Sequence, residues 1–227
     1  MESVVSPSPA EEQRSKVTRK ERVAMRRQRL VAVNDDRQGA VPRLCIDLSL
    51  GHLMSEKEIG GLVCQIRQVY GANRQADKPM QVWLTSLDTE GSIYKASLTK
   101  NDGFEHYVMN KTSQHYSAIF SQEEIVYLTP DSPNVLTEIQ DRKVYIIGGL
   151  VDESVLTNMT FDLAKKRGFH TAKLPISRCM KHAERGTFSQ VLAINQVFDI
   201  LLRYYNTGNW ESSVVAVMPK RKGFIPK

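Results

Sequence analysis

Two short apolar runs constrain the fold of this chain more than any other feature of its sequence. "EEIVYLT" spans residues 123–129 and "KVYIIGG" spans residues 143–149, and neither run alternates between apolar and polar side chains. Strands that are apolar on both sides are typical of a parallel sheet with helices on both faces. Each run is far shorter than the roughly 18 apolar residues needed to cross a bilayer. We therefore expect an α/β domain with a parallel sheet and no membrane partner.

The rest of the chain after residue 40 alternates between strand and helix patterns. Ser55, with Glu58 three residues later, forms a capping box that opens a helix with one apolar face. Residues 87–121 have no clear period and are expected to form an exposed excursion. This alternation predicts a doubly wound sheet. The predicted strands are 43–48, 80–86, 123–129, 143–149 and 171–175, and the predicted helices are 55–73, 132–140, 154–168 and 187–208, of which the last is the longest.

Positive charge is concentrated before residue 40. Residues 14–29 hold eight Lys or Arg and one acid, Glu21, a net charge of +7, whereas the whole chain of 227 residues carries +6. We expect a basic arm, helical or partly disordered, over residues 1–40 and a nearly neutral domain over residues 41–227. Such an arm indicates a polyanion partner, nucleic acid first, because cations that meet phosphates release condensed counterions. A solvated tail, a nuclear-import signal and a mitochondrial presequence are the alternatives.

Cysteine and histidine spacing excludes several classes of site. Three cysteines lie far apart without a CxxC pair, and five histidines show no metal-ligand spacing. We expect no disulfide framework, no metal, and a reducing compartment, the cytoplasm or nucleus rather than a mitochondrion. The first 30 residues are charged, so no secretory signal is expected. The chain also lacks GxGxxG, GxxxxGK[ST] and GxSxG, which disfavours a dinucleotide-binding protein, a P-loop NTPase and a serine hydrolase.

Three loops follow predicted strands, where open α/β sheets place their ligands. They are "LTPDSPN" from residue 128, "GGLVDE" from residue 148 and "LPISRCMK" from residue 174. Gly148 and Gly149 allow a backbone to approach a flat ligand closely, and Asp152 follows three residues later. The alternative is a tight turn whose Asp caps a helix that begins near Ser154.

Seven fragments in consistent order resemble one family. They include "IDLSLGHLMSEKEIGGLVCQIRQVYGANRQADKPMQVWLTS", "HYSAIF", "IVYLTPDSPNVL", "KVYIIGGLVDES", "TAKLPI", "VLAINQVFDIL" and "NWESSVVAVMPKRKG", across residues 44–223. Together they resemble the tRNA N1-purine methyltransferases that act on the ninth nucleotide, within the SPOUT superfamily, and the basic arm is similar too. The resemblance implies a parallel sheet whose C-terminal part forms a trefoil knot, with S-adenosylmethionine bound by the knot loops.

The resemblance also implies roles for individual residues, by position. Asp152 matches the proposed catalytic base, and Asp131 matches a supporting carboxylate. "NRQ" has Gln75 where the family pattern has a second arginine, and the loop between residues 174 and 191 departs most from the family. The implied cofactor contacts are Leu128, Thr129, Pro130, Gly148, Gly149, Leu150, Leu174, Leu192 and Asn195. The implied substrate contacts or supports are Gln65, Asn73 and Arg74, to which the basic arm adds Arg26 and Arg27.

The chemistry of a guanine target agrees with a carboxylate in this position. N1 of neutral guanine carries a proton that must leave, so a positioned base assists the reaction. Burial would raise the pKa of such an Asp above its ordinary value of about 4 and make it a better base. N1 of adenine offers a lone pair and needs no base. We expect a monomeric enzyme that methylates tRNA, guanine first; the alternative is a non-catalytic RNA-binding or scaffolding subunit with the same fold.

Overall fold

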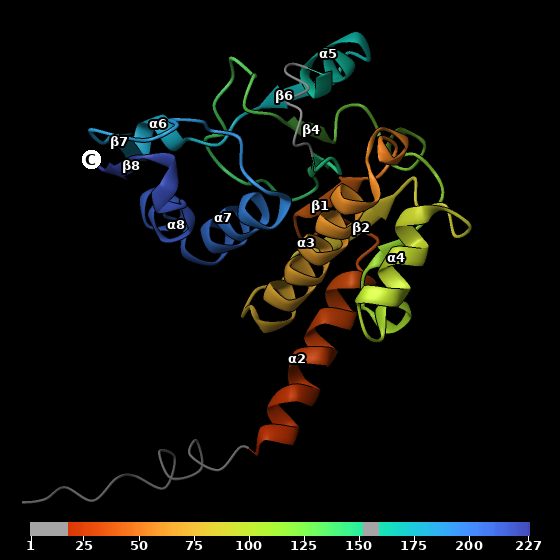
Figure 1. Ribbon diagram of the computed structural model, residues 1–227. Coiled ribbons are helices and arrows are strands. Elements are labelled where there is room, and N and C mark those ends of the chain that lie inside the picture. The colour runs from red at the N-terminus through yellow and green to blue at the C-terminus, as the bar shows by residue number, and fades with distance from the viewer. Residues whose placement is uncertain (1–17, 152–158) are drawn as a thin grey trace, which may run out of the picture.

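The computed structural model describes residues 18–151 and 159–227, and most of its strands belong to one central sheet (Figure 1). Six strands lie in the order β3-β2-β1-β5-β4-β6, and every neighbouring pair is parallel. Their carboxyl ends meet at one edge, since Asp47 pairs with both Thr85 and Gly148. The bounds are β1 Arg43–Asp47, β2 Gln81–Thr85, β3 Asn110–Lys111, β4 Ile125–Leu128, β5 Val144–Gly148 and β6 His170–Ala172.

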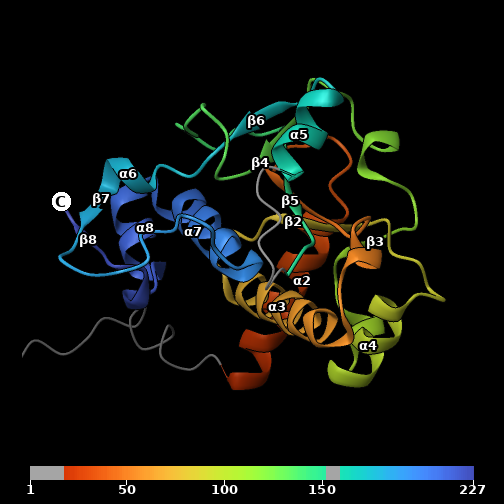
Figure 2. The same cartoon turned by 45° about the horizontal axis from the view of Figure 1, so that its top comes forward.

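Helices cover both faces of this sheet, as predicted (Figure 2). Leu44 and Ile46 of β1 share the larger core with α3 (Glu56–Gln75) and α7 (Ile194–Thr207). Cys45 points to the other face, into a smaller core with Ala164 of α5 (Met159–Lys166). Successive side chains of a strand point to opposite faces, so unbroken apolar strands supply both cores. The C-terminal trefoil knot stays a prediction.

Helix α3 begins where its capping box predicts. The Ser55 hydroxyl accepts a hydrogen bond from Glu58 N, and the Glu58 carboxylate accepts one from Ser55 N at 2.8 Å. Eight of its residues are buried, among them Ile59, Leu62 and Ile66 on the predicted apolar face. With 20 residues it is the longest helix in the described part of the chain, so the prediction that 187–208 is the longest is wrong.

Two other predicted helices need correction. Residues 132–140 form no helix, because Val135 bridges Lys173 in parallel and Leu136 N donates to Lys173 O at 2.8 Å. The last predicted helix starts at Ile194 rather than at residue 187. Two backbone amides at this end donate to side chains: Ala193 N to Gln196 Oε1, and Ile194 N to Gln65 Oε1. These bonds satisfy amides that have no partner within the helix, so the helix begins here. Its end at Gly208, which has a φ of 69°, is confirmed.

Residues 87–121 are not the exposed excursion that their lack of period predicts. They contain α4 (Ser92–Lys100) and β3, and Phe104, Tyr116 and Phe120 are buried. The aromatic side chains bury much area each, so this segment covers the sheet without a regular helix pattern.

The described residues of the basic arm and the C-terminal segment both pack on the domain. Within the arm, residues 19–34 form α2 (Arg19–Asn34), with Thr18 and Glu21 forming its capping box, and Leu30 is its one residue described as buried. After β6 come α6 (Ile176–Cys179), β7 (Met180–His182), α7, α8 (Trp210–Val217) and β8 (Phe224–Pro226). Strands β7 and β8 pair antiparallel, with Lys181 opposite Ile225. No helix of the described residues is long and apolar enough to span a membrane.

Candidate functional site

A cavity of about 430 Å³ lies at the carboxyl ends of β4 and β5. Leu128, the last residue of β4, pairs with Ile147, the penultimate residue of β5, and both line the cavity. Seven of the nine predicted cofactor contacts line it, although they come from segments up to 64 positions apart in the chain. They are Leu128, Thr129, Pro130, Gly148, Leu150, Leu174 and Leu192. The parallel sheet brings these loops together because it aligns the ends of its strands.

Two predicted cofactor contacts lie outside this cavity wall. Gly149 N donates to Asp47 O at 2.7 Å, and a Cβ added to Gly149 would lie 2.6 Å from that same oxygen. The glycine therefore allows the end of β5 to pass close to β1, and its contact with a cofactor stays a prediction. Asn195 lies in the first turn of α7, where Ile194 and Val197 line the cavity instead. Residues three apart share a helix face, and Asn195 is turned from that face.

Another wall of the cavity is an irregular segment before α7, although the sequence pattern predicts a helix there. Ser189, Gln190, Val191 and Leu192 line the cavity from this segment. Val191 is 59% exposed in spite of its apolar side chain. Because the segment is not helical, its residues can face the cavity without the spacing of 3.6 residues per turn that a helix imposes. The apolar stripe fits a helix as well as this irregular backbone, so only the family resemblance pointed to this wall, through Leu192.

The C-terminal turn closes the same wall. Lys222 lines the cavity and donates from its Nζ to Val191 O at 2.8 Å. Two backbone bonds reinforce this link, from Phe188 N to Lys222 O at 2.9 Å and from Ala183 N to Gly223 O at 2.8 Å. Burial and the nearby Arg221 lower the pKa of Lys222. The "PKRK" run is therefore part of the pocket structure and not only a basic tail.

The cavity combines an apolar surface with a few polar groups. Thr129, Asp131, Lys173 and Lys222 supply side-chain donors and acceptors among leucine, isoleucine and valine side chains. This mixture is typical of small-molecule sites, where apolar walls bury a ligand and scattered polar groups orient it. The described residues contain no cluster of His, Cys, Asp or Glu that could hold a metal. Asp152, the predicted base, lies outside the described residues, two positions after Leu150.

The predicted substrate residues have different positions. Gln65 Oε1 accepts from Ile194 N at 2.8 Å, and Asn73 is buried and bonds both Met80 N and Met80 O, so both hold the domain together. Arg74 is exposed, and its guanidinium lies over the Tyr70 ring, 5.5 Å from the centroid. Arg27 is exposed on α2. A basic hollow between α2 and α3 is lined by Arg19, Arg22, Val23, Arg26, Arg74 and Gln75.

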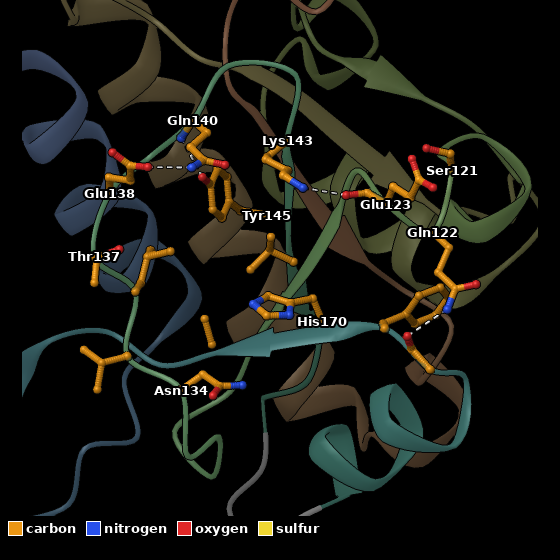
Figure 3. Close-up of a pocket in the computed structure, with 16 residues that line it drawn as sticks. Ser121, Gln122, Glu123, Asn134, Thr137, Glu138, Gln140, Lys143, Tyr145 and His170 are labelled. Carbon is orange, nitrogen blue, oxygen red and sulfur yellow. Dashed lines mark hydrogen bonds between the residues drawn. The ribbon is translucent and has the colours of Figure 1, made fainter.

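A larger hollow, of about 980 Å³, lies near the other ends of β4 and β5 (Figure 3). Its labelled polar side chains include Lys143, which donates to Glu123 O at 2.6 Å. Tyr145 OH accepts from Gln140 N at 2.8 Å, and burial raises the pKa of Tyr145 to about 12. Open α/β sheets place ligands at the opposite, carboxyl edge, so we assign the site to the smaller cavity.

The fold and the cavity define a SPOUT-type α/β protein with a ligand pocket at the carboxyl ends of parallel strands. The sequence model of the tRNA (guanine(9)-N(1))-methyltransferase TRM10/TRM10A family matches residues 7–223. The chain therefore belongs to that family, and the predicted resemblance is confirmed.

Individual relatives agree with this assignment. "tRNA methyltransferase 10 homolog B" of Bos taurus is 44% identical over 186 residues, which cover 81% of this chain and 59% of that protein. "tRNA methyltransferase 10 homolog A" of Homo sapiens is 39% identical over 186 residues, 81% of this chain and 53% of that protein. A solved spTrm10 (full-length)–SAH complex is 31% identical, with a TM-score of 0.70, and covers 78% of this chain and 95% of that one. This chain thus spans 59% of the length of the first relative.

Proposed function

We propose that this protein transfers a methyl group from S-adenosylmethionine to N1 of guanine at the ninth nucleotide of tRNA. One observation carries the proposal: seven residues chosen for cofactor binding converge on one cavity at the carboxyl edge of the sheet. Membership of the family and the SAH complex of a relative support the same cofactor.

The residues present fit such a cofactor. Leu128, Leu150 and Leu174 offer apolar surface to an adenosine, and Lys222 offers a cation to a carboxylate. S-adenosylmethionine, when bound, supplies an electrophilic methyl group. The segment at Val191 and the turn at Lys222 would cover the ligand and exclude water.

The cavity wall can be tested by placing a charge on it. Val191→Asp is expected to weaken S-adenosylmethionine binding by about tenfold or more, because a bound ligand would cover the new carboxylate and strip its water. Its exposed position means that the free energy of unfolding should change by less than about 0.5 kcal/mol. Titration calorimetry measures the affinity, and Leu163→Asp, on the exposed side of α5, is the matched control. Equal affinities for both variants would place the cofactor elsewhere.

Helix α2 and Arg74 support tRNA as the substrate. The exposed Arg26 and Arg27 lie on a helix with a strong excess of positive charge. Arg26→Gln with Arg27→Gln should lower the slope of log affinity against log salt by about 1 to 2, because each phosphate contact contributes roughly 0.9. The control is the double variant Lys165→Gln with Lys166→Gln, which removes the same amount of positive charge from α5. A slope that falls equally in both double variants would contradict a specific role for α2.

The activity itself is tested by methyl transfer to total tRNA, followed by nucleoside mass spectrometry. The expected product is 1-methylguanosine from the ninth nucleotide. Tight tRNA binding without any methylated product would favour the non-catalytic RNA-binding alternative. The monomeric state and a cytoplasmic or nuclear location belong to the same proposal; sedimentation with and without tRNA tests the first.

A further inference from the structure

Helix α2 is held at its C-terminal end by one buried side chain of the sheet. Gln81, the first residue of β2, is 3% exposed. Its Nε2 donates to Val33 O at 3.3 Å, to Asn34 O at 3.0 Å and to Asp36 O at 2.8 Å. Its Oε1 accepts from Trp83 Nε1 at 2.9 Å. The last carbonyls of a helix have no partner within the helix, so Gln81 caps α2 from another element.

Three further residues complete this attachment. Leu30 is 2% exposed and belongs to the main core. Arg29 Nη1 donates to Ala76 O at 3.1 Å and to Asp77 O at 2.8 Å, just after α3 ends. The Asn110 side-chain amide donates to Asn34 Oδ1 at 3.1 Å. The last two turns of α2 are therefore docked, while the first turns extend from the domain (Figure 1).

This attachment fixes where the cations of α2 point. The helix has 16 residues, so it is about 24 Å long. A small change of angle at Gln81 would move Arg19 by several ångströms. Arg26 also faces Arg74 of α3 across the basic hollow, and their relative position depends on the same docking.

We propose that Gln81 is a positioning residue for tRNA capture, which holds α2 as an oriented phosphate-binding arm instead of a freely swinging one. The inference rests on the proposed function for the identity of the polyanion. A docked helix loses no orientational freedom when the substrate binds, so a preorganised arm binds more tightly than the same charges on a loose tether. Among the described residues, Gln81 lines neither the cavity nor the basic hollow, so it would act through the direction of α2.

Two variants of the full chain release α2 from opposite sides without removing a cation. Gln81→Glu replaces the amide donor with a carboxylate that faces three carbonyl oxygens, and Leu30→Ala removes the apolar anchor on the helix itself. Gln68→Glu, on the exposed side of α3, is the matched charge control. Hydrogen exchange of residues 19–36 should accelerate by about tenfold in both variants and not in the control. Calorimetry with S-adenosylmethionine should give the wild-type affinity in all four proteins.

The functional measurement compares the effect of each variant on KM for tRNA with its effect on kcat. Both releasing variants should raise the KM for tRNA roughly three- to tenfold and leave kcat at saturating tRNA within about twofold. A variant that had merely lost part of its fold would instead lower kcat and cofactor binding together. The inference would be overturned if wild type and both variants bound tRNA with equal affinity. It would also be overturned if none of the three bound tRNA. Wild type that binds tRNA through a docked α2 but transfers no methyl group would contradict the proposed activity and leave the positioning role supported.

Discussion

Asp152→Asn should lower the single-turnover rate of methyl transfer to a guanine-containing tRNA by about 10² to 10⁴. The amide keeps the size of the side chain and cannot accept the N1 proton of guanine. The affinity for S-adenosylmethionine should change little, because Asp152 follows the cavity-lining Leu150 and is assigned to the substrate rather than to the cofactor. Rapid-quench assays with enzyme in excess over tRNA isolate the methyl-transfer step.

The pH profile separates a base from a structural carboxylate. The Asn variant should gain rate as pH rises, because deprotonated guanine no longer needs a base. An adenine at the ninth position would remove most of the difference between variant and wild type. Asp162→Asn, on α5, provides the control with the same change of side chain. A full rate in Asp152→Asn together with a large loss in Asp131→Asn would assign the base to Asp131, which lines the cavity.

Gly149→Ala should lower the free energy of unfolding by about 3 kcal/mol. An extra atom forced into a packed interior typically costs about 1 to 3 kcal/mol, and this position is expected to be at the upper end of that range. The new Cβ would lie 2.6 Å from Asp47 O and 2.8 Å from Leu48 Cδ2. The carbonyl cannot retreat freely, because it already accepts Gly149 N at 2.7 Å. Urea denaturation measures the change in free energy, and the cofactor affinity of the remaining folded protein measures any effect on the cavity.

Gly71→Ala should raise the free energy of unfolding instead of lowering it, and it serves as the matched control. Gly71 lies inside α3, and a Cβ there would meet nothing within 4 Å. Alanine favours a helix over glycine by up to about 1 kcal/mol, so this variant should be more stable than wild type. Similar stabilities for Gly149→Ala and Gly71→Ala would contradict the close approach of β5 to β1.

Local interactions account for the elements that could be predicted. The strands around Val126 and Ile146 are apolar on both sides, and the capping box of Ser55 and Glu58 involves residues three positions apart. Such signals depend on a few neighbouring residues, and these elements form where they were expected. The loops at the strand ends followed from them, because parallel strands align their carboxyl ends. The individual residues came from the family resemblance instead, and seven of the nine predicted cofactor contacts line the cavity.

Contacts between residues far apart in the sequence decided the features that the sequence patterns did not predict. Residues 187–193 have a helix-like stripe, yet Gln65 bonds Ile194 across 129 positions, and the C-terminal turn bonds the segment before it. Gly149 follows Gly148 directly, yet only the approach of β1 shows that it serves packing. Gln81 is one polar residue at the start of a strand in the sequence, and only the folded chain places it under the end of α2. A pattern records which side chains prefer burial or a turn, whereas the partner of a polar group depends on which segments the whole fold brings within about 3 Å.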